Sequence, residues 1–171
     1  STKEVGLGMF SVAVKELVEA LPDGTVVTDP QSLEAYRHDR AEDPHAALPV
    51  AVVRAESTEQ VQTAVRIAAK AGLPVVPRGA GSGLSAGATS SKPALVISLE
   101  RMREIEIDPA TKIARVQPGL MNAEVKLAAA EHGLWYPPDP SSFEFCSIGG
   151  NIATNAGGLC CVKYGVTVDY V

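Results

Sequence analysis

The stretch PRGAGSGLSAGATSS, residues 77–91, contains four glycines and a single large apolar side chain, Leu84. Glycine lacks a Cβ atom, so a segment of this composition lets another group approach the backbone closely. The stretch follows the β-prone residues 73–77, so successive backbone N–H groups can converge at the end of a strand and form an anion-binding nest. This feature predicts a site for a diphosphate, although a wide turn between two strands remains an alternative.

The spacing of these glycines argues against two common nucleotide-binding loops. Gly79, Gly81 and Gly83 run as G-x-G-x-G, whereas NAD-binding domains open a helix with G-x-G-x-x-G. No Gly-Lys-Ser/Thr sequence occurs, which argues against a Walker loop. Arg78 either adds positive charge to the nest or forms a surface salt bridge, and both alternatives stay open.

A second glycine-rich region, SIGGNIATNAGG, spans residues 147–158. It places Asn151, Thr154 and Asn155 between two Gly-Gly pairs, so hydroxyl and amide groups alternate with bare backbone. This pattern suits a polar ligand with many acceptor atoms. The alternative is a pair of turns that contain asparagine in the left-handed conformation.

Apolar periodicity and turn signals give a coarse outline of the chain. They predict helices at residues 10–21, 32–37, 57–72 and 122–133, strands at 50–55, 73–77 and 94–99, and a hairpin over 103–119. Ser57 is the expected cap of its helix, with Gln60 completing a capping box. Residues 39–48 are polar and predict a connecting loop, while the last residues, 164–171, are β-prone. We expect a helical lead-in at 1–48 and one domain at 49–171.

Composition excludes several classes of protein. The net charge of -5, from 15 basic and 20 acidic side chains, argues against nucleic acid as a partner. The three cysteines show no disulfide framework or metal-ligand spacing, so no metal is expected. No apolar run approaches the roughly 20 residues that span a bilayer, and no signal peptide is evident. The expectation is a cytoplasmic protein without a membrane span.

The motifs PVVPRGAGSGLSAGA and YPPDPSS…CSIGGNIATNAGG…KYGVTVDYV together resemble a known family. They are similar to the FAD-linked oxidases of the vanillyl-alcohol oxidase / p-cresol methylhydroxylase (PCMH) superfamily, in particular to the D-lactate dehydrogenase / glycolate oxidase FAD-subunit branch. The resemblance runs from about Pro49 to Val171. It implies an α+β fold, the N-terminal part of a PCMH-type FAD-binding domain, with a mixed sheet and flanking helices.

By this resemblance, residues 78–83 wrap the FAD diphosphate and Leu84 and Ser85 continue the contact, while the second glycine-rich region contacts the diphosphate, the ribose or the flavin. The implied cofactor-binding residues are Pro77, Arg78, Gly79, Ala80, Gly81, Ser82, Gly83, Leu84, Ser85, Pro138, Asp139, Ser147, Gly149, Gly150, Asn151, Thr154, Asn155, Ala156, Gly157, Tyr164 and Gly165.

Two departures from the family pattern concern covalent attachment of the flavin. Ser82 stands where covalent relatives carry histidine, so FAD is expected to bind non-covalently. Cys146 is one position away from the cysteine of bicovalent relatives, and a buried inert thiol is expected there. Family members continue beyond residue 171, so the catalytic base and any metal are expected downstream, and the catalytic residues of this chain stay unknown. Of the three histidines, His38 and His45 are expected to be solvated beside a polar loop, and His132 is expected at the end of a helix.

The resemblance implies that the whole protein oxidises a 2-hydroxy acid, of the D-lactate or glycolate type, by hydride transfer to non-covalent FAD. The electron acceptor, a homo-oligomeric state and the exact substrate stay open. One alternative is an isolated FAD-binding module without activity. Another is the same fold acting on an alkyl-phenol, a sugar or a sugar-lactone alcohol.

Overall fold

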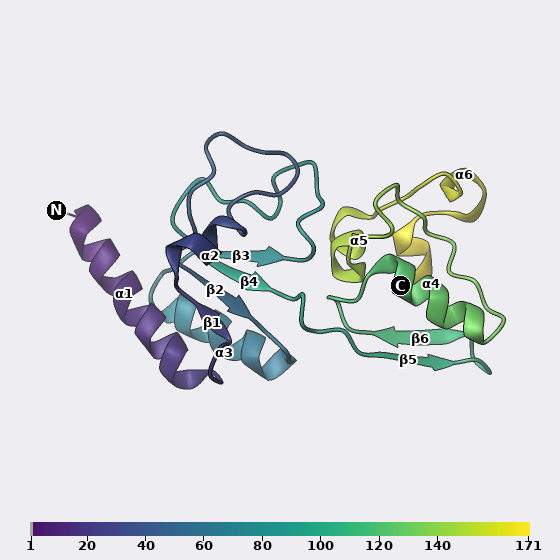
Figure 1. Ribbon diagram of the computed structural model, residues 1–171, viewed down its shortest axis with the longest axis horizontal. Helices are drawn as coiled ribbons and strands as arrows, with labels where there is room; N and C mark the ends of the chain where they lie inside the picture. The colour runs from purple at the N-terminus through teal and green to yellow at the C-terminus, as the bar shows by residue number, and fades with distance from the viewer. Residues whose placement is uncertain (1) are drawn as a thin grey trace. The chain divides into compact units, whose positions relative to one another are not determined.

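The computed structural model describes residues 2–171, with side chains from residue 8 onward. The chain divides into two compact units after Arg101, and each unit has its own sheet (Figure 1). Among the described residues, no helix is both long and apolar enough to cross a membrane.

The first unit is built on a four-stranded sheet in the order β1-β2-β4-β3. Its strands are β1 (Val26–Val27), β2 (Ala51–Arg54), β3 (Val75–Arg78) and β4 (Leu95–Ser98). β2, β4 and β3 are parallel, and β1 pairs with β2 in the antiparallel direction, so the predicted mixed sheet is confirmed. Arg54, Ser98 and Arg78 lie side by side in register, which brings the ends of the three parallel strands to one edge.

The two central strands of this sheet are buried on both faces, as expected for parallel strands covered by helices. The covering helices are α1 (Thr2–Ala20), α2 (Pro30–Glu34) and α3 (Thr58–Lys70). On one face, Leu33 of α2 packs against Val52 and Val96. α3 contacts β4 and packs against α1. The helix predicted at 10–21 is therefore present, although it begins earlier in the chain.

The predicted start and end of α3 are both observed. The Ser57 hydroxyl oxygen accepts a hydrogen bond of 3.3 Å from the Gln60 N–H. The Gln60 side chain accepts from the Glu56 N–H at 2.9 Å, one residue before the position that a standard capping box uses. Gly72, with φ at +60°, ends the helix.

Replacing Ser57 with alanine is expected to destabilise the protein by about 1 kcal/mol, because the Gln60 N–H loses its partner. Urea denaturation of the two proteins measures this loss. Ser91→Ala, which removes the hydroxyl of an exposed loop serine, is the matched control and should stay within about 0.5 kcal/mol of the wild type. Equal losses in both variants would contradict the capping role.

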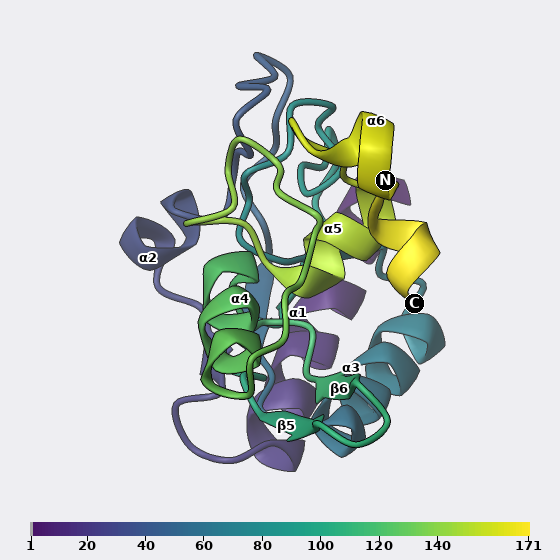
Figure 2. The same ribbon diagram turned by 90° about the vertical axis from the view of Figure 1, so that its right-hand side faces the viewer.

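The second unit begins with the predicted hairpin and helix. β5 (Ile105–Asp108) and β6 (Ile113–Val116) are antiparallel, and α4 (Asn122–Glu131) packs over them (Figures 1 and 2). The core of this unit consists of Leu120, Val125 and Ile148, with partly buried neighbours from both strands.

The second glycine-rich region differs from the loop that its composition indicates. Its first half forms the short helix α5 (Ile148–Thr154), capped by the Ser147 hydroxyl. Asn155 ends α5 in the left-handed conformation, with φ at 48°, as the turn alternative expected. A polar, glycine-containing sequence becomes helical here because Ser147 caps its first turn and Ile148 packs into the core.

The C-terminal residues, of which 164–171 are β-prone, also form helical turns, namely α6 (Cys161–Tyr164) and the 3₁₀ helix η1 (Thr167–Tyr170). The buried Thr167 donates both its N–H and its hydroxyl to the Ala156 carbonyl oxygen. The Asp169 carboxylate accepts a hydrogen bond of 2.7 Å from the Val166 N–H. These local contacts override the β propensity of the valines, which is weak compared with packing.

Candidate cofactor-binding site

The glycine-rich loop leaves the sheet at the edge where the three parallel strands end, because Arg78 is the last residue of β3. Ligands of open α/β sheets bind at this edge. Gly81 has φ at +68°, a conformation that favours glycine. Among the described residues, none accepts a hydrogen bond from the backbone N–H groups of residues 79–85. A row of free donors at the end of a strand fits an anion such as a diphosphate.

The Arg78 side chain folds back over this loop. Its guanidinium occupies the space that a Cβ atom on Gly81 would fill. Nη2 makes a long hydrogen bond of 3.5 Å to the Ala35 carbonyl oxygen, whereas Nη1 is buried without a partner. Burial lowers the pKa of Arg78, while the nearby Asp39 carboxylate and Tyr36 oppose this shift. Within the described part of the chain Arg78 forms no ion pair, so the salt-bridge alternative is not observed.

Asp39 ties the preceding segment to the glycine-rich loop. Its buried carboxylate accepts hydrogen bonds from the N–H groups of Ala41, at 2.9 Å, and Ala88, at 3.5 Å. Its own N–H donates to the Thr89 hydroxyl at 3.1 Å. Residues 39–48 were expected to form only a connecting loop, and nothing in their spacing distinguishes the carboxylate at position 39 from its acidic neighbours.

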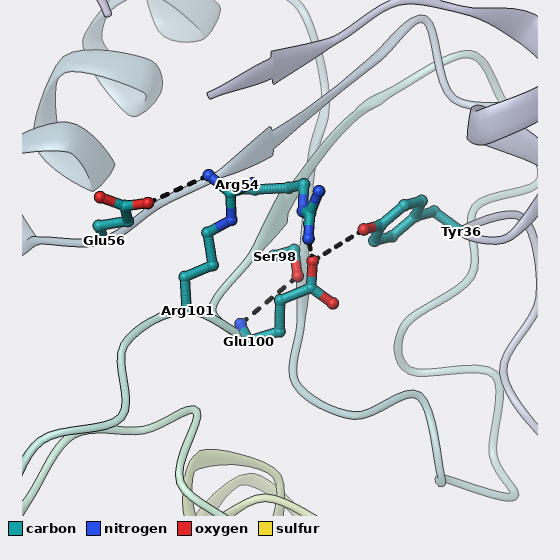
Figure 3. A network of polar contacts seen from close by, with 6 residues as sticks. All are labelled: Tyr36, Arg54, Glu56, Ser98, Glu100 and Arg101. Atoms are coloured by element: carbon teal, nitrogen blue, oxygen red, sulfur yellow. Dashed lines mark hydrogen bonds and ion pairs between the residues drawn. The ribbon is translucent and has the colours of Figure 1, made fainter. Parts of the chain in front are cut away.

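A polar network lies beside this loop at the same sheet edge. Figure 3 shows Tyr36 and Arg54 pointing toward Glu100, whose Oε1 accepts from the Tyr36 hydroxyl at 2.8 Å and from Arg54 Nε at 2.7 Å. Burial raises the pKa of Tyr36, and its hydrogen bond to Glu100 raises it further. The hydrogen bond to Glu100 raises the pKa of Arg54. Tyr36 therefore stays protonated and donates its hydrogen bond.

In the second unit, Gly149 serves helix packing. A Cβ atom at this position would lie 2.7 Å from Pro118 Cβ and 3.0 Å from the Pro118 carbonyl oxygen. The Gly149 N–H donates to that same oxygen at 2.9 Å. Ser147 is buried, and its hydroxyl accepts from the Gly150 N–H at 3.3 Å. Close packing therefore accounts for Gly149 without a ligand.

The side chain of Asn151 points into the second unit. Its Nδ2 donates to the sulfur of Cys146 at 3.1 Å, and its Oδ1 accepts from Asn122 Nδ2 at 3.0 Å. Asn122 Nδ2 also donates to the Pro138 carbonyl oxygen at 3.2 Å. Cys146 is 2% exposed, so the expected buried thiol is confirmed. Sequence reasoning missed Asn122 because a helix start is an ordinary place for asparagine.

Asp139 organises the chain around Gly158. Its Oδ1 accepts a hydrogen bond of 3.1 Å from the Cys160 N–H. Burial raises the pKa of Asp139, but hydrogen bonds from Cys160 and the charge of Lys126 outweigh burial, so the pKa is lowered. The Asp139 side chain in turn raises the pKa of the Cys160 thiol, which disfavours a reactive thiolate.

The predicted site residues fall into two groups. Residues 77–85 belong to the first unit, and those from 138 to 165 belong to the second. That both groups line one cofactor stays a prediction, as does each predicted contact. The described residues contain no group of three His, Cys, Asp or Glu side chains that could hold a metal ion. His45 and His132 are exposed, and His38 is half-buried.

The chain matches a known protein family over most of its length. The model of a family described as an FAD binding domain matches residues 49–171. The chain therefore belongs to this family of FAD-binding domains. FAD contains a diphosphate, and the free N–H groups of residues 79–85 with the unpartnered Arg78 Nη1 fit that part of the cofactor.

Three curated relatives are similar to this chain. The glycolate oxidase subunit GlcD of Escherichia coli (strain K12) is 47% identical over 121 residues, which are 70% of this chain and 24% of the relative. A D-2-hydroxyglutarate dehydrogenase of Stutzerimonas stutzeri is 39% identical over 159 residues, 92% of this chain and 34% of the relative. A D-lactate dehydrogenase of Anaerostipes hadrus is 38% identical over 159 residues, 92% of this chain and 33% of the relative. The chain thus spans only 24–34% of these relatives.

Solved structures confirm the predicted fold. An alkyldihydroxyacetonephosphate synthase superposes with a TM-score of 0.82 at 25% identity, covering 93% of this chain and 34% of the synthase. p-Cresol methylhydroxylase superposes with a TM-score of 0.76 at 24% identity, covering 87% of this chain and 30% of that enzyme. The α+β fold of the PCMH type is therefore confirmed, and together with the family match and the glycolate oxidase relative this confirms the relationship to FAD-linked oxidases.

Proposed function

We propose that these residues are the FAD-binding part of an oxidoreductase that oxidises a 2-hydroxy acid of the glycolate or D-lactate type. The observation that carries the proposal is the 47% identity with a glycolate oxidase subunit. Relatives named for D-lactate and D-2-hydroxyglutarate support it. All three acids carry a hydroxyl group on the carbon next to a carboxylate. The proposed substrate of this protein carries the same arrangement.

In this proposal the chain binds and orients the cofactor. The N–H groups of residues 79–83 and the guanidinium of Arg78 hold the diphosphate. The bound flavin supplies the hydride acceptor for oxidation of the substrate alcohol. Ser82 offers no ring nitrogen for a bond to the flavin, which supports non-covalent binding. The N-terminal residues 1–48 contribute Asp39 and Tyr36 beside this loop.

The test uses the full-length protein under anaerobic conditions, with the visible absorption of the flavin as readout. Glycolate, D-lactate and D-2-hydroxyglutarate are compared with p-cresol and glucose. At least one 2-hydroxy acid is expected to bleach the flavin, whereas p-cresol and glucose leave it oxidised. Bleaching by p-cresol or glucose alone would reject the proposed substrate class. Denaturation is expected to release the FAD, and yellow colour retained on the denatured chain would reject non-covalent binding.

The 171 residues on their own are expected to bind FAD without turning over any of these acids, because they span 24–34% of the relatives. Measurable turnover by this chain alone would show that the catalytic base lies within it. A colourless chain that ignores added FAD would instead favour a module that needs the rest of the protein for cofactor binding.

A further inference from the structure

We infer that Tyr36 is a positioning residue for Arg78, and that it holds the guanidinium over the glycine-rich loop in the orientation that receives the FAD diphosphate. This inference rests on the proposed role of Arg78 in holding that diphosphate. Tyr36 lies outside the residues matched by the family model, which begin at position 49. It comes beside the loop only through the fold.

Two neighbours support the Arg78 guanidinium: the Asp39 carboxylate attracts its charge, and the Tyr36 ring lies against it. The guanidinium carbon lies 5.7 Å from the centre of the Tyr36 ring, within the range of a cation–π interaction. Among the described residues, the guanidinium makes one hydrogen bond, to the Ala35 carbonyl oxygen, which is 3.5 Å long and therefore weak. Without the ring, the guanidinium would keep only this weak hydrogen bond and the attraction of the Asp39 carboxylate, neither of which fixes the plane of the group beside Gly81.

Tyr36 is itself fixed at both ends. Its ring packs against the core cluster of Leu33, Val52 and Val96. Its hydroxyl donates to Glu100 at 2.8 Å, and Arg54 holds the same carboxylate oxygen (Figure 3). A ring held in this way offers Arg78 a rigid surface at the sheet edge where the loop begins.

Fixing Arg78 in advance favours anion binding, because a long side chain that is already ordered loses less entropy when a ligand arrives. Its Nη1 is buried and has no partner among the described residues, so one charged donor has its hydrogen-bonding capacity unused. Tyr36 makes no contribution of this kind in the absence of the arginine. Its effect on FAD affinity must therefore disappear when Arg78 is replaced.

A double-mutant cycle on the full-length protein tests this dependence, with FAD affinity of the apoprotein measured by calorimetry. Arg78→Met is expected to weaken binding about tenfold to hundredfold, from loss of a charged hydrogen-bond donor. Tyr36→Leu should weaken it about threefold to fivefold, and Tyr36→Phe, which keeps the ring, by less than about twofold. The Tyr36→Leu/Arg78→Met double variant should bind FAD no more weakly than Arg78→Met alone.

The control background is Arg115→Met, which removes an arginine whose side chain is 85% exposed in the hairpin. In that background Tyr36→Leu should keep its full effect on FAD affinity. Equal losses from Tyr36→Leu in the Arg78→Met and Arg115→Met backgrounds would overturn the inference, since a general structural defect acts in both. An unchanged affinity in Tyr36→Leu would overturn it as well.

A second measurement keeps the inference separate from FAD binding. The Arg78 Nε–H signal in the NMR spectrum, identified by its loss in Arg78→Met, reports the order of the side chain in the absence of FAD. Tyr36→Phe should leave this signal in place, whereas Tyr36→Met, a variant that retains an apolar side chain, should shift or broaden it. An Arg78 signal unaffected by Tyr36→Met would overturn the inference even if the proposed cofactor role of the loop holds. If the NMR signal changes as expected but the protein does not bind FAD, only the proposed cofactor role of the loop is rejected.

Discussion

Replacing Gly158 with alanine is expected to destabilise the folded protein by about 2–3 kcal/mol, as overpacking of a filled site does. The new Cβ atom would overlap the carbonyl group of Asp139, which is main chain and cannot rotate away. Moving that main chain would also break the hydrogen bond of 3.1 Å from the Cys160 N–H to the Asp139 carboxylate. Urea denaturation, followed by circular dichroism, measures the loss.

The matched control is Gly87→Ala, another glycine in a loop. Gly87 is exposed and does not have a positive φ, and no described atom lies within 4 Å of the position that a Cβ atom would take. Its replacement should change the free energy of unfolding by less than about 0.5 kcal/mol. Equal denaturation midpoints for the two variants would mean that the main chain around Asp139 adapts freely, contrary to the packing described above.

The glycines show which part of the candidate site could be predicted from the amino-acid sequence. Composition alone marks both glycine-rich regions as places of close approach, and this is correct. At Gly149 and Gly158 the approaching group is the protein's own backbone. At Gly81 it is the Arg78 side chain, beside free N–H groups that fit an anion. Sequence cannot separate these cases, because a missing Cβ atom does not say what fills its place.

More of the fold than of the candidate site could be predicted from the amino-acid sequence. The strands near Val52, Val76 and Val96 and the cap at Ser57 follow from local patterns, and the structure confirms them. β1 was missed because its two residues carry too little pattern and depend on pairing with β2. The contact of Tyr36 with Glu100 joins residues 64 positions apart, which no local pattern reports.

The second large effect is expected at Asn122, the fully buried first residue of α4. Asn122→Leu should destabilise the protein by about 2–3 kcal/mol, because it leaves two buried oxygens without a donor. These are the Pro138 carbonyl oxygen and Asn151 Oδ1, at 3.2 and 3.0 Å from Asn122 Nδ2. The Oδ1 atom of Asn122 has no partner among the described residues, so its removal offsets part of the loss. The free energy of unfolding in urea is again the measurement.

Gln62→Leu provides the control, since it makes the matching amide-to-leucine change on the exposed face of α3 and should stay within about 0.5 kcal/mol of the wild type. The Asn122→Leu/Asn151→Leu double variant should lose less stability than the sum of the single variants, because it removes both members of one buried hydrogen bond. Strictly additive losses would show that the two amides act independently. Less-than-additive losses would establish that Asn122 supports the second glycine-rich region through Asn151, and that the side chain of Asn151 serves the interior of its own unit.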